Sequence, residues 1–187
     1  MVTETNPGWK PEDFTPYMKV VFDAFGEDRV MFGSDWPVCL LNGDYKKVYD
    51  IAYKFTGKHS KTARSKVFSK NALRFYRDRT PLVKQPQTLQ RVDSHQHFWH
   101  YSKEEYGWIN PETMAPIARS FLPDDLKKAI TTAKMNATIA VQARESHEET
   151  QMLLDFAAEN EHICGVVGWV DLKDPNLRQT LKKYEGN

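Results

Sequence analysis

Residues 29–37 read Arg-Val-Met-Phe-Gly-Ser-Asp-Trp-Pro. The apolar first part predicts a short buried strand, Arg29–Asp35, that ends in a carboxylate. Gly33 permits close approach of another backbone, and Pro37 stops further strand pairing. In a parallel barrel the active site lies at the carboxyl ends of the strands. Asp35 is therefore placed to act as a base or a metal ligand, with a helix-cap or turn role as the alternative.

A second polar group follows the stretch Arg91-Val-Asp-Ser-His-Gln-His-Phe98, which also predicts a strand. Side chains at positions i and i+2 of a strand point to the same face. His95 and His97 can therefore converge on one metal ion or one substrate. A His-x-His pair alone does not decide the matter, because ordinary polar residues at a strand end give the same pattern.

The remaining sequence alternates helix and strand signals. Apolar residues at helical spacing predict helices over residues 13–25, with Asp13 as N-cap, and over 45–55 and 63–75. Further helices are expected from Pro123, from the capping box that begins at Ser146, and from Asp174. Apolar strands are expected over 137–142 and 163–172. Short apolar strands alternating with helices predict a parallel sheet covered by helices.

Composition limits the classes of function. The chain has 187 residues, of which 40% are hydrophobic and 27% charged, and a net charge of +1, so we expect a globular protein with no nucleic-acid or membrane partner. The polar start lacks the layout of a signal peptide, and no apolar run approaches the roughly 20 residues of a membrane helix. Cys39 and Cys164 stand far apart and predict reduced thiols in a cytoplasmic protein.

Together the two strand motifs resemble those of the amidohydrolase-related family, and most of all its sugar-lactone hydrolases of the L-fuconolactonase and L-rhamnonolactonase type. Residues 29–41 resemble the family's last-strand motif, and residues 93–99, followed by Tyr106-Gly-Trp108, resemble its first-strand motif. The resemblance extends over residues 71–76, 139–143 and 165–169.

The order of these motifs is reversed relative to the family. Residues 1–80 resemble the family's carboxyl-terminal barrel part, residues 81–91 form a linker rich in proline and glutamine, and residues 92–187 resemble the amino-terminal part. The central strands have no counterpart, and a complete barrel needs about 250 residues. The resemblance thus implies an α/β fold, an incomplete, permuted (β/α)8 TIM-barrel arc with parallel strands. Because the last and first strands of a closed barrel pair, residues 29–35 and 92–98 should be neighbours.

The resemblance also implies a chemistry. Asp35 would be the general base in hydrolysis of a sugar lactone or related cyclic ester, within carbohydrate metabolism. His95 and His97, with Asp35, would hold a divalent metal such as zinc or, in members without metal, position the substrate. Independently of the resemblance, the flat faces of Trp36, Trp99, Trp108 and Tyr106 could line a sugar-sized pocket, with rim packing of a barrel as the alternative. At the end of the second strand, Gln142 and Arg144 would bind hydroxyl or carboxylate groups, with solvent exposure as the alternative for Arg144.

Three hypotheses for the whole chain follow. It is a lactone hydrolase, a non-catalytic gene fragment, or an assembly module completed by a partner chain that carries the central strands. Open strand edges expose unpaired backbone groups and favour self-association or a complementing chain. We expect the chain alone to lack full activity.

Overall fold

The computed structural model of the chain describes residues 2–4, 8–77 and 91–185. Of the predicted linker, only Arg91 lies within these residues. The elements before it are η1 (Val2–Glu4), η2 (Pro11–Phe14), α1 (Thr15–Phe25), η3 (Val38–Leu41), α2 (Tyr45–His59), α3 (Ala63–Ser65), η4 (Lys66–Lys70) and α4 (Asn71–Arg77). Those after it are β1 (Val92–Gln96), η5 (Ala115–Ile117), α5 (Pro123–Thr132), β2 (Ala137–Val141), α6 (His147–Glu159), β3 (Ile163–Val167) and α7 (Leu177–Tyr184).

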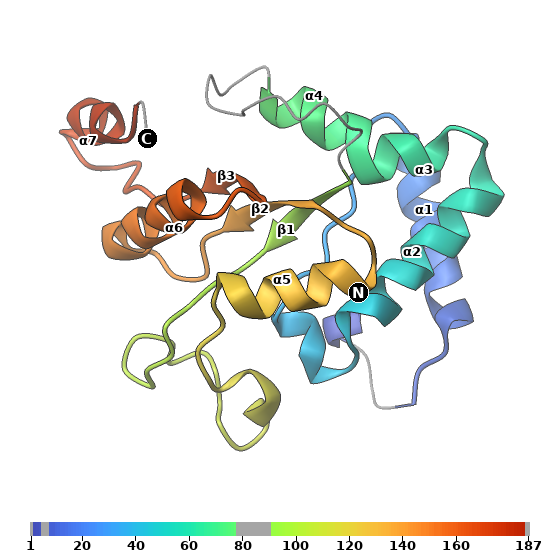
Figure 1. Ribbon diagram of the computed structural model, residues 1–187, viewed down its shortest axis with the longest axis horizontal. Helices are drawn as coiled ribbons and strands as arrows, with labels where there is room; N and C mark the ends of the chain where they lie inside the picture. Colours follow the sequence, from blue (N-terminus) through green and yellow to red (C-terminus); the bar gives the residue numbers. More distant parts are fainter. Residues whose placement is uncertain (1, 5–7, 78–90, 186–187) are drawn as a thin grey trace.

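The strands form a parallel sheet in the order β1-β2-β3. Helices α5 and α6 connect successive strands and lie along one side of the sheet, whereas α4 lies along the other (Figure 1). The predicted α/β class with parallel strands is confirmed. The reversed order of an incomplete barrel, and the division of the chain at residues 80 and 92, stay predictions.

The predicted strand Arg29–Asp35 is not a regular strand, and this expectation was wrong. The segment is extended and lies beside β1, held by bonds from Ser94 N to Phe32 O (2.8 Å) and from Asp35 N to His95 O (2.9 Å). A parallel bridge joins Trp36 to Gln96. The predicted neighbourhood and direction are therefore confirmed, but no regular ladder forms: Ser34 N donates to the Asp93 side chain (2.9 Å) in place of a backbone oxygen of β1, and Asp35 has a left-handed φ of 58°.

Gly33 has the close backbone contact that the sequence predicted. A Cβ atom at this position would lie 2.7 Å from the Cβ of His95, closer than real side chains approach. A glycine is therefore needed where the extended segment comes closest to β1.

Three element boundaries differ from prediction. The first helical segment begins at Pro11, and Asp13 accepts a bond from Lys10 N (2.8 Å) within the first turn, so Asp13 is not the N-cap. The predicted strand over residues 163–172 ends at Val167 because Trp169 N donates to Thr150 Oγ1 of α6 (2.8 Å) instead. The predicted helix over residues 63–75 is divided into α3, η4 and α4. Ser146 is confirmed as an N-cap, since its side chain accepts from Glu149 N.

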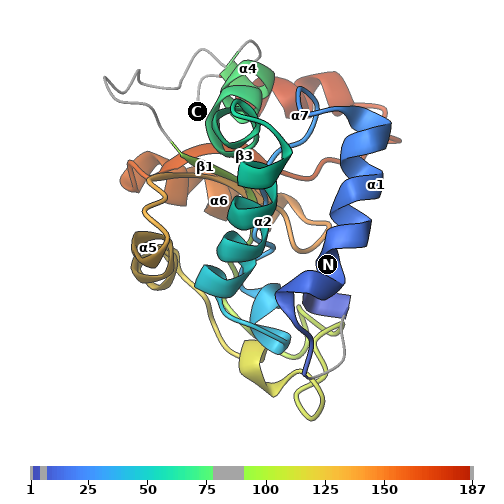
Figure 2. The ribbon, with the colours of Figure 1, turned by 90° about the vertical axis from the view of Figure 1, so that its right-hand side faces the viewer.

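One hydrophobic core unites the two parts of the chain. Aromatic residues of the first part, among them Phe32 and Phe68, belong to the same buried cluster as Phe98, Phe121 and other residues of the second part. Helix α1 packs on α2 through an edge contact of Phe22 with Phe55 and lies at the outer edge of the molecule (Figure 2).

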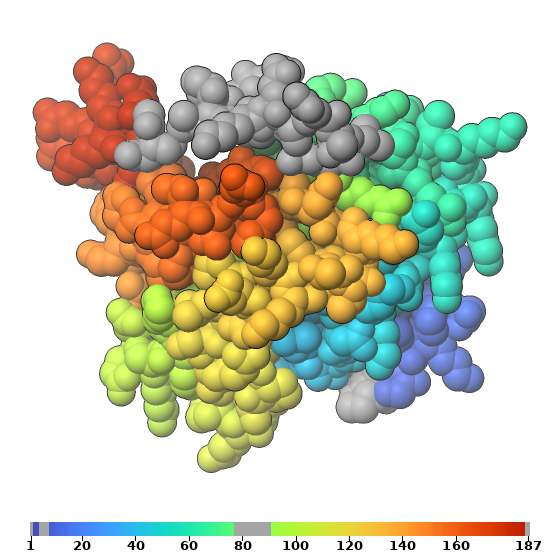
Figure 3. Space-filling view, viewed as in Figure 1, coloured from blue at the N-terminus to red at the C-terminus, as the bar shows by residue number. Residues whose placement is uncertain are grey.

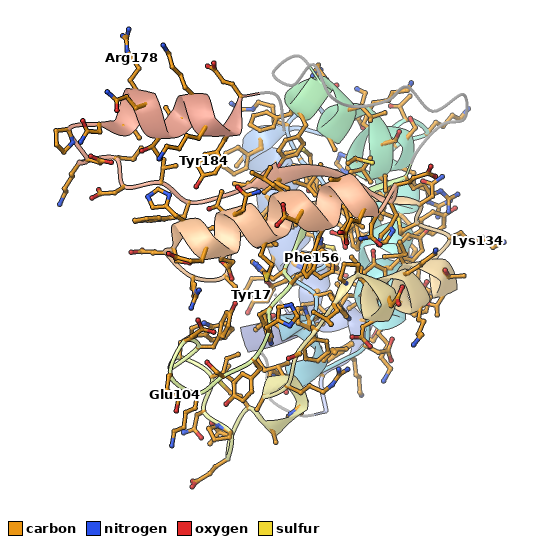
Figure 4. All side chains as sticks on the ribbon, turned by 60° about the vertical axis from the view of Figure 1, so that its left-hand side comes forward. Tyr17, Glu104, Lys134, Phe156, Arg178 and Tyr184 are labelled. Carbon is orange, nitrogen blue, oxygen red and sulfur yellow. The ribbon has the colours of Figure 1, made fainter. Side chains whose placement is uncertain are left out.

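Helix α7 is the least embedded helix, since it contains no buried residue. It projects from one corner of the molecule (Figure 3). Tyr184 points from α7 toward α6, where its hydroxyl lies 3.0 Å from His147 Nδ1, and Arg178 points away (Figure 4). Among the described residues, none of the helices has the length and apolar character required to cross a bilayer.

Glu27 connects the turn after α1 to the helices that follow α2. Its carboxylate accepts hydrogen bonds from Lys66 Nζ (2.8 Å), Ser60 Oγ and Thr62 Oγ1 (2.7 Å). These donors, Lys66 foremost, lower the pKa of Glu27 from its ordinary value of 4.5 to about 2. The carboxylate thus stabilises the folded state only while it is ionised.

We predict that Glu27→Gln lowers the melting temperature at pH 7 and that the difference from wild type shrinks as pH falls. A depressed carboxylate pKa contributes stability above pH 4.5, and this is lost progressively as pH falls toward 2. Thermal unfolding of both proteins between pH 7 and 2 provides the measurement, with Glu104→Gln in an exposed loop as control. A difference that stays constant over this range would contradict the assignment.

Candidate active site

Asp35, His95 and His97 meet at the carboxyl ends of β1 and of the extended segment beside it. One ligand atom from each residue lies within 4.8 Å of the other two. The predicted convergence of these three side chains is confirmed, while their chemical roles stay predictions.

A bulge in β1 sets the direction of the histidines. Asp93 pairs with Thr138 and Gln96 with Ala140, so β1 contains one more residue than β2 over this interval. The bulge leaves Asp93 and Gln96 fully buried, whereas the His95 side chain is 48% exposed. Simple alternation would have placed Asp93 on the same face as His95.

The Asp35 carboxylate uses its two oxygens differently. Oδ1 lies 3.2 Å from His97 Nε2 and 3.8 Å from His95 Nε2, and Oδ2 accepts a bond from Thr3 Oγ1 (2.9 Å). Burial raises the pKa of Asp35, but the contact with His97, the hydrogen bond from Thr3 and the nearby imidazoles outweigh burial and hold the pKa below its usual value. Asp35 is therefore ionised at neutral pH.

The tautomer of His97 follows from its partners. Nδ1 lies 2.9 Å from the carbonyl oxygen of Val141, which can only accept, so Nδ1 bears a hydrogen and Nε2 faces Asp35. A bare lone pair on Nε2 would repel the carboxylate. A proton or a cation between them removes this repulsion.

His95 favours the neutral form. Burial lowers its pKa and His97 lowers it further, although Asp35 acts in the opposite direction. A neutral imidazole is the form that binds metal.

The three side chains are compatible with a divalent metal. Bonds of about 2.0–2.1 Å in tetrahedral geometry place neighbouring ligand atoms about 3.3 Å apart. The distances of 3.2 and 3.8 Å from Asp35 Oδ1 to the imidazole nitrogens bracket this value. The bond between His97 Nδ1 and a backbone carbonyl is the usual support of a metal-binding histidine. Three such ligands would leave one position open, as in catalytic zinc sites.

Asp93 holds this arrangement from the covered face, a role that the sequence reasoning did not anticipate. Its Oδ1 accepts from Ser34 N (2.9 Å) and His95 N (3.2 Å), and its Oδ2 from the Tyr45 hydroxyl (2.9 Å). Burial raises the pKa of Asp93 to about 6, against the opposing effect of these bonds. The sequence signal that could have indicated this role is the position of Asp93, two residues before the His-x-His pair.

The tryptophans predicted to bind substrate are in the core. Trp36 is 2% exposed and packs edge-on against Phe98 and Phe121. Trp99 is fully buried, and its Nε1 donates to Arg119 O (2.7 Å). Both rings are buried among aromatic side chains, which fits the packing alternative, and substrate binding by either ring stays a prediction.

Gln142 and Arg144 lie after β2, as expected, but Arg144 is already engaged. Its guanidinium pairs with Glu105 (2.7 Å) and bonds to Ser146 Oγ (3.1 Å). Gln142 donates its backbone N–H to Val167 O (2.9 Å), and its side-chain oxygen is buried without a hydrogen-bond partner among the described residues. Substrate binding by either residue stays a prediction.

Comparisons with known proteins place the chain near lactonases. Residues 1–77 match the model of a family described as amidohydrolase. An L-fucono-1,5-lactonase from Burkholderia multivorans is 43% identical over 96 residues, which cover 51% of this chain and 32% of that protein. An L-fucono-1,5-lactonase from Burkholderia ambifaria is 40% identical over 83 residues, which cover 44% of this chain and 28% of that protein. The chain spans about a third of the length of these relatives.

Similar solved structures agree. Two crystal structures of an amidohydrolase from Burkholderia multivorans, one with bound HEPES and one with bound zinc, each give a TM-score of 0.50 at 42% identity. Each match covers 52% of this chain. It covers 33% of the chain with bound HEPES and 34% of the chain with bound zinc.

We predict that Asp93→Ala destabilises the fold by about 3 kcal/mol or more, because each buried donor left unpaired costs about 1–3 kcal/mol. Asp93→Asn should stay near wild type, since its amide keeps an acceptor for the backbone donors and a polar partner for Tyr45. Urea unfolding gives the free energies. Asp50→Ala serves as control, because this carboxylate forms an exposed ion pair with Lys46, worth about 0–1 kcal/mol. Equal losses in Asp93→Ala and Asp50→Ala would refute the role of Asp93.

We predict that His97→Ala weakens zinc binding at least about 100-fold, beyond the roughly 10–100-fold cost of losing a ligand's hydrogen-bond partner. His100→Ala, at an exposed histidine, should bind zinc as wild type does. Competition with a chromophoric chelator measures both affinities. Equal zinc affinity of His97→Ala and wild type would exclude His97 as a ligand.

Proposed function

Since this chain is amidohydrolase-related and of the L-fuconolactonase type, we propose that it acts in the hydrolysis of a sugar lactone or related cyclic ester, with Asp35 as general base. One observation supports this above the others. An ionised carboxylate directs one oxygen, Asp35 Oδ1, toward two imidazole nitrogens at the carboxyl ends of neighbouring parallel segments. A base so placed typically contributes roughly 10²–10⁴ in rate.

In the proposed reaction Asp35 accepts a proton from a water molecule as the water oxygen attacks the lactone carbonyl carbon. The bond between that carbon and the ring oxygen then breaks. The proton passes from Asp35 to the departing ring oxygen, and the product is the open hydroxy acid. His97, fixed through Nδ1 by Val141 O, keeps Nε2 directed at the reacting side of Asp35.

The proposal includes a divalent metal, zinc for preference, held by Asp35, His95 and His97. When bound, such an ion would polarise the lactone carbonyl and lower the pKa of a water molecule. Zinc in a similar amidohydrolase supports the choice of ion. The proposal also places the protein in the cytoplasm, where the thiols of Cys39 and Cys164 would stay reduced.

A second candidate is an assembly module that a partner chain completes. Strand β3 lies at the edge of the sheet, and Val167 at its end is exposed. Helix α1 presents Tyr17, Val20 and Phe25 to solvent (Tyr17 is labelled in Figure 4). Exposed apolar groups and an open edge favour docking of further strands and helices. In this form the chain contributes the base and the metal ligands, and the partner closes the pocket.

We predict that the 187-residue chain alone hydrolyses five- and six-membered sugar lactones far below the ordinary range of about 1–10³ s⁻¹, because its site is open to water. The residual rate should disappear in Asp35→Asn. A pH-stat assay of both proteins with zinc present measures it. Ordinary turnover by the chain alone would contradict the need for a partner, and residual turnover unaffected by Asp35→Asn would contradict the base.

Complementation distinguishes a module that a partner chain completes from a chain without catalytic function. The chain is mixed with the part of the Burkholderia multivorans lactonase that it does not match. A rise in the Asp35-dependent rate would support the completed site, and no rise would favour a chain without catalytic function.

A further inference from the structure

The Asp35 carboxylate has a third partner outside the strands. Thr3, in η1, donates its hydroxyl to Asp35 Oδ2 at 2.9 Å, across 32 residues of sequence. The hydroxyl is the donor, since a carboxylate oxygen can only accept. Asp35 leaves the extended segment in a left-handed conformation, so pairing with β1 does not by itself orient the carboxylate.

Thr3 is held in place independently of its hydroxyl. Asn42 Nδ2 donates to the Thr3 backbone oxygen (3.1 Å), and Trp9 Nε1 donates to Asn42 O (2.7 Å). Next to Thr3, Val2 is 4% exposed and packs in a cluster with Phe14, Met18 and Ile51. Removal of the hydroxyl alone should therefore leave η1 where it is.

We propose that Thr3 is a positioning residue that makes Asp35 a one-oxygen ligand. By occupying Oδ2, the Thr3 hydroxyl directs Oδ1 alone to the point that both imidazoles face. Without it, the terminal torsion of an aspartate, which is broad and soft, lets both oxygens turn toward the metal. Two carboxylate oxygens on one ion would occupy the position that substrate or water needs. This inference rests on the metal role in the proposed function.

The test compares Thr3→Val, which keeps the shape but lacks the donor, with Thr3→Ser, which keeps the hydroxyl. Zinc affinity is measured by competition with a chromophoric chelator, and the visible absorption of the Co²⁺-substituted protein reports the number of ligands. We expect the zinc affinity of Thr3→Val to fall by less than the roughly 10–100-fold that loss of a ligand's hydrogen-bond partner usually costs, because the second Asp35 oxygen on the ion offsets part of that loss. Its cobalt bands should weaken, as they do when the coordination number rises. Thr3→Ser should match wild type in both, and all three proteins should melt alike.

Each other result overturns the inference. If Thr3→Val matches wild type in zinc affinity and cobalt spectrum, the hydroxyl does not position Asp35, although the proposed metal site stands. If Thr3→Ser is as weak as Thr3→Val, the methyl group matters and not the donor. If wild type binds no zinc, the metal role in the proposed function fails and the inference fails with it. Thr3→Ala replaces Thr3→Val should the latter not fold, and is judged by the same comparisons.

Discussion

The rest of the structure depends on the three hydrogen bonds accepted by the buried Asp93 carboxylate. Ser34 N belongs to the extended segment, His95 N to the bulge of β1, and the Tyr45 hydroxyl to the start of α2. A fully buried carboxylate is costly unless donors surround it, so its three partners cannot separate without leaving it unpaired. This constraint fixes the segment that ends at Asp35 against the strand that bears the histidines.

Two carboxylates, Asp93 in β1 and Asp35 in the extended segment beside it, lie in different environments and have opposite pKa shifts. Asp93 lies in the core, where burial raises its pKa to about 6. Asp35 lies on the open face, where imidazoles and the Thr3 hydroxyl lower its pKa despite partial burial. Environments that shift the pKa values of two acids in opposite directions suit the two acids to different roles. Asp93 accepts hydrogen bonds from the backbone, and Asp35 remains available for chemistry.

The sequence predicted those features whose contacts lie between residues close in the chain or within a recognisable motif. The neighbourhood of residues 29–36 and β1, the glycine contact at Gly33 and the N-cap at Ser146 all followed from short stretches. The irregular pairing near Asp35 could not be predicted from short stretches of sequence. It depends on hydrogen bonds between residues far apart in the chain, such as those that Asp93 accepts from Ser34 N and the Tyr45 hydroxyl. The burial of Trp36 and Trp99 likewise depends on aromatic partners brought together only by the fold. Thr3 has no signal in the sequence that relates it to Asp35.

Within the part of the chain that the structure describes, the contacts that orient the three site residues come from η1, the extended segment, β1 and the end of β2, with support from α2 through Asp93 and from η3 through Cys39. None requires a closed barrel. The proposed base and metal ligands can therefore come together without the rest of a barrel. Exclusion of water is a separate requirement, because it needs protein residues on every side of the site. Electrostatic stabilisation of a developing oxyanion depends on that second condition, since preorganised groups act strongly only where water is absent. A chain of this kind can possess an ordered site and still depend on further strands for its rate.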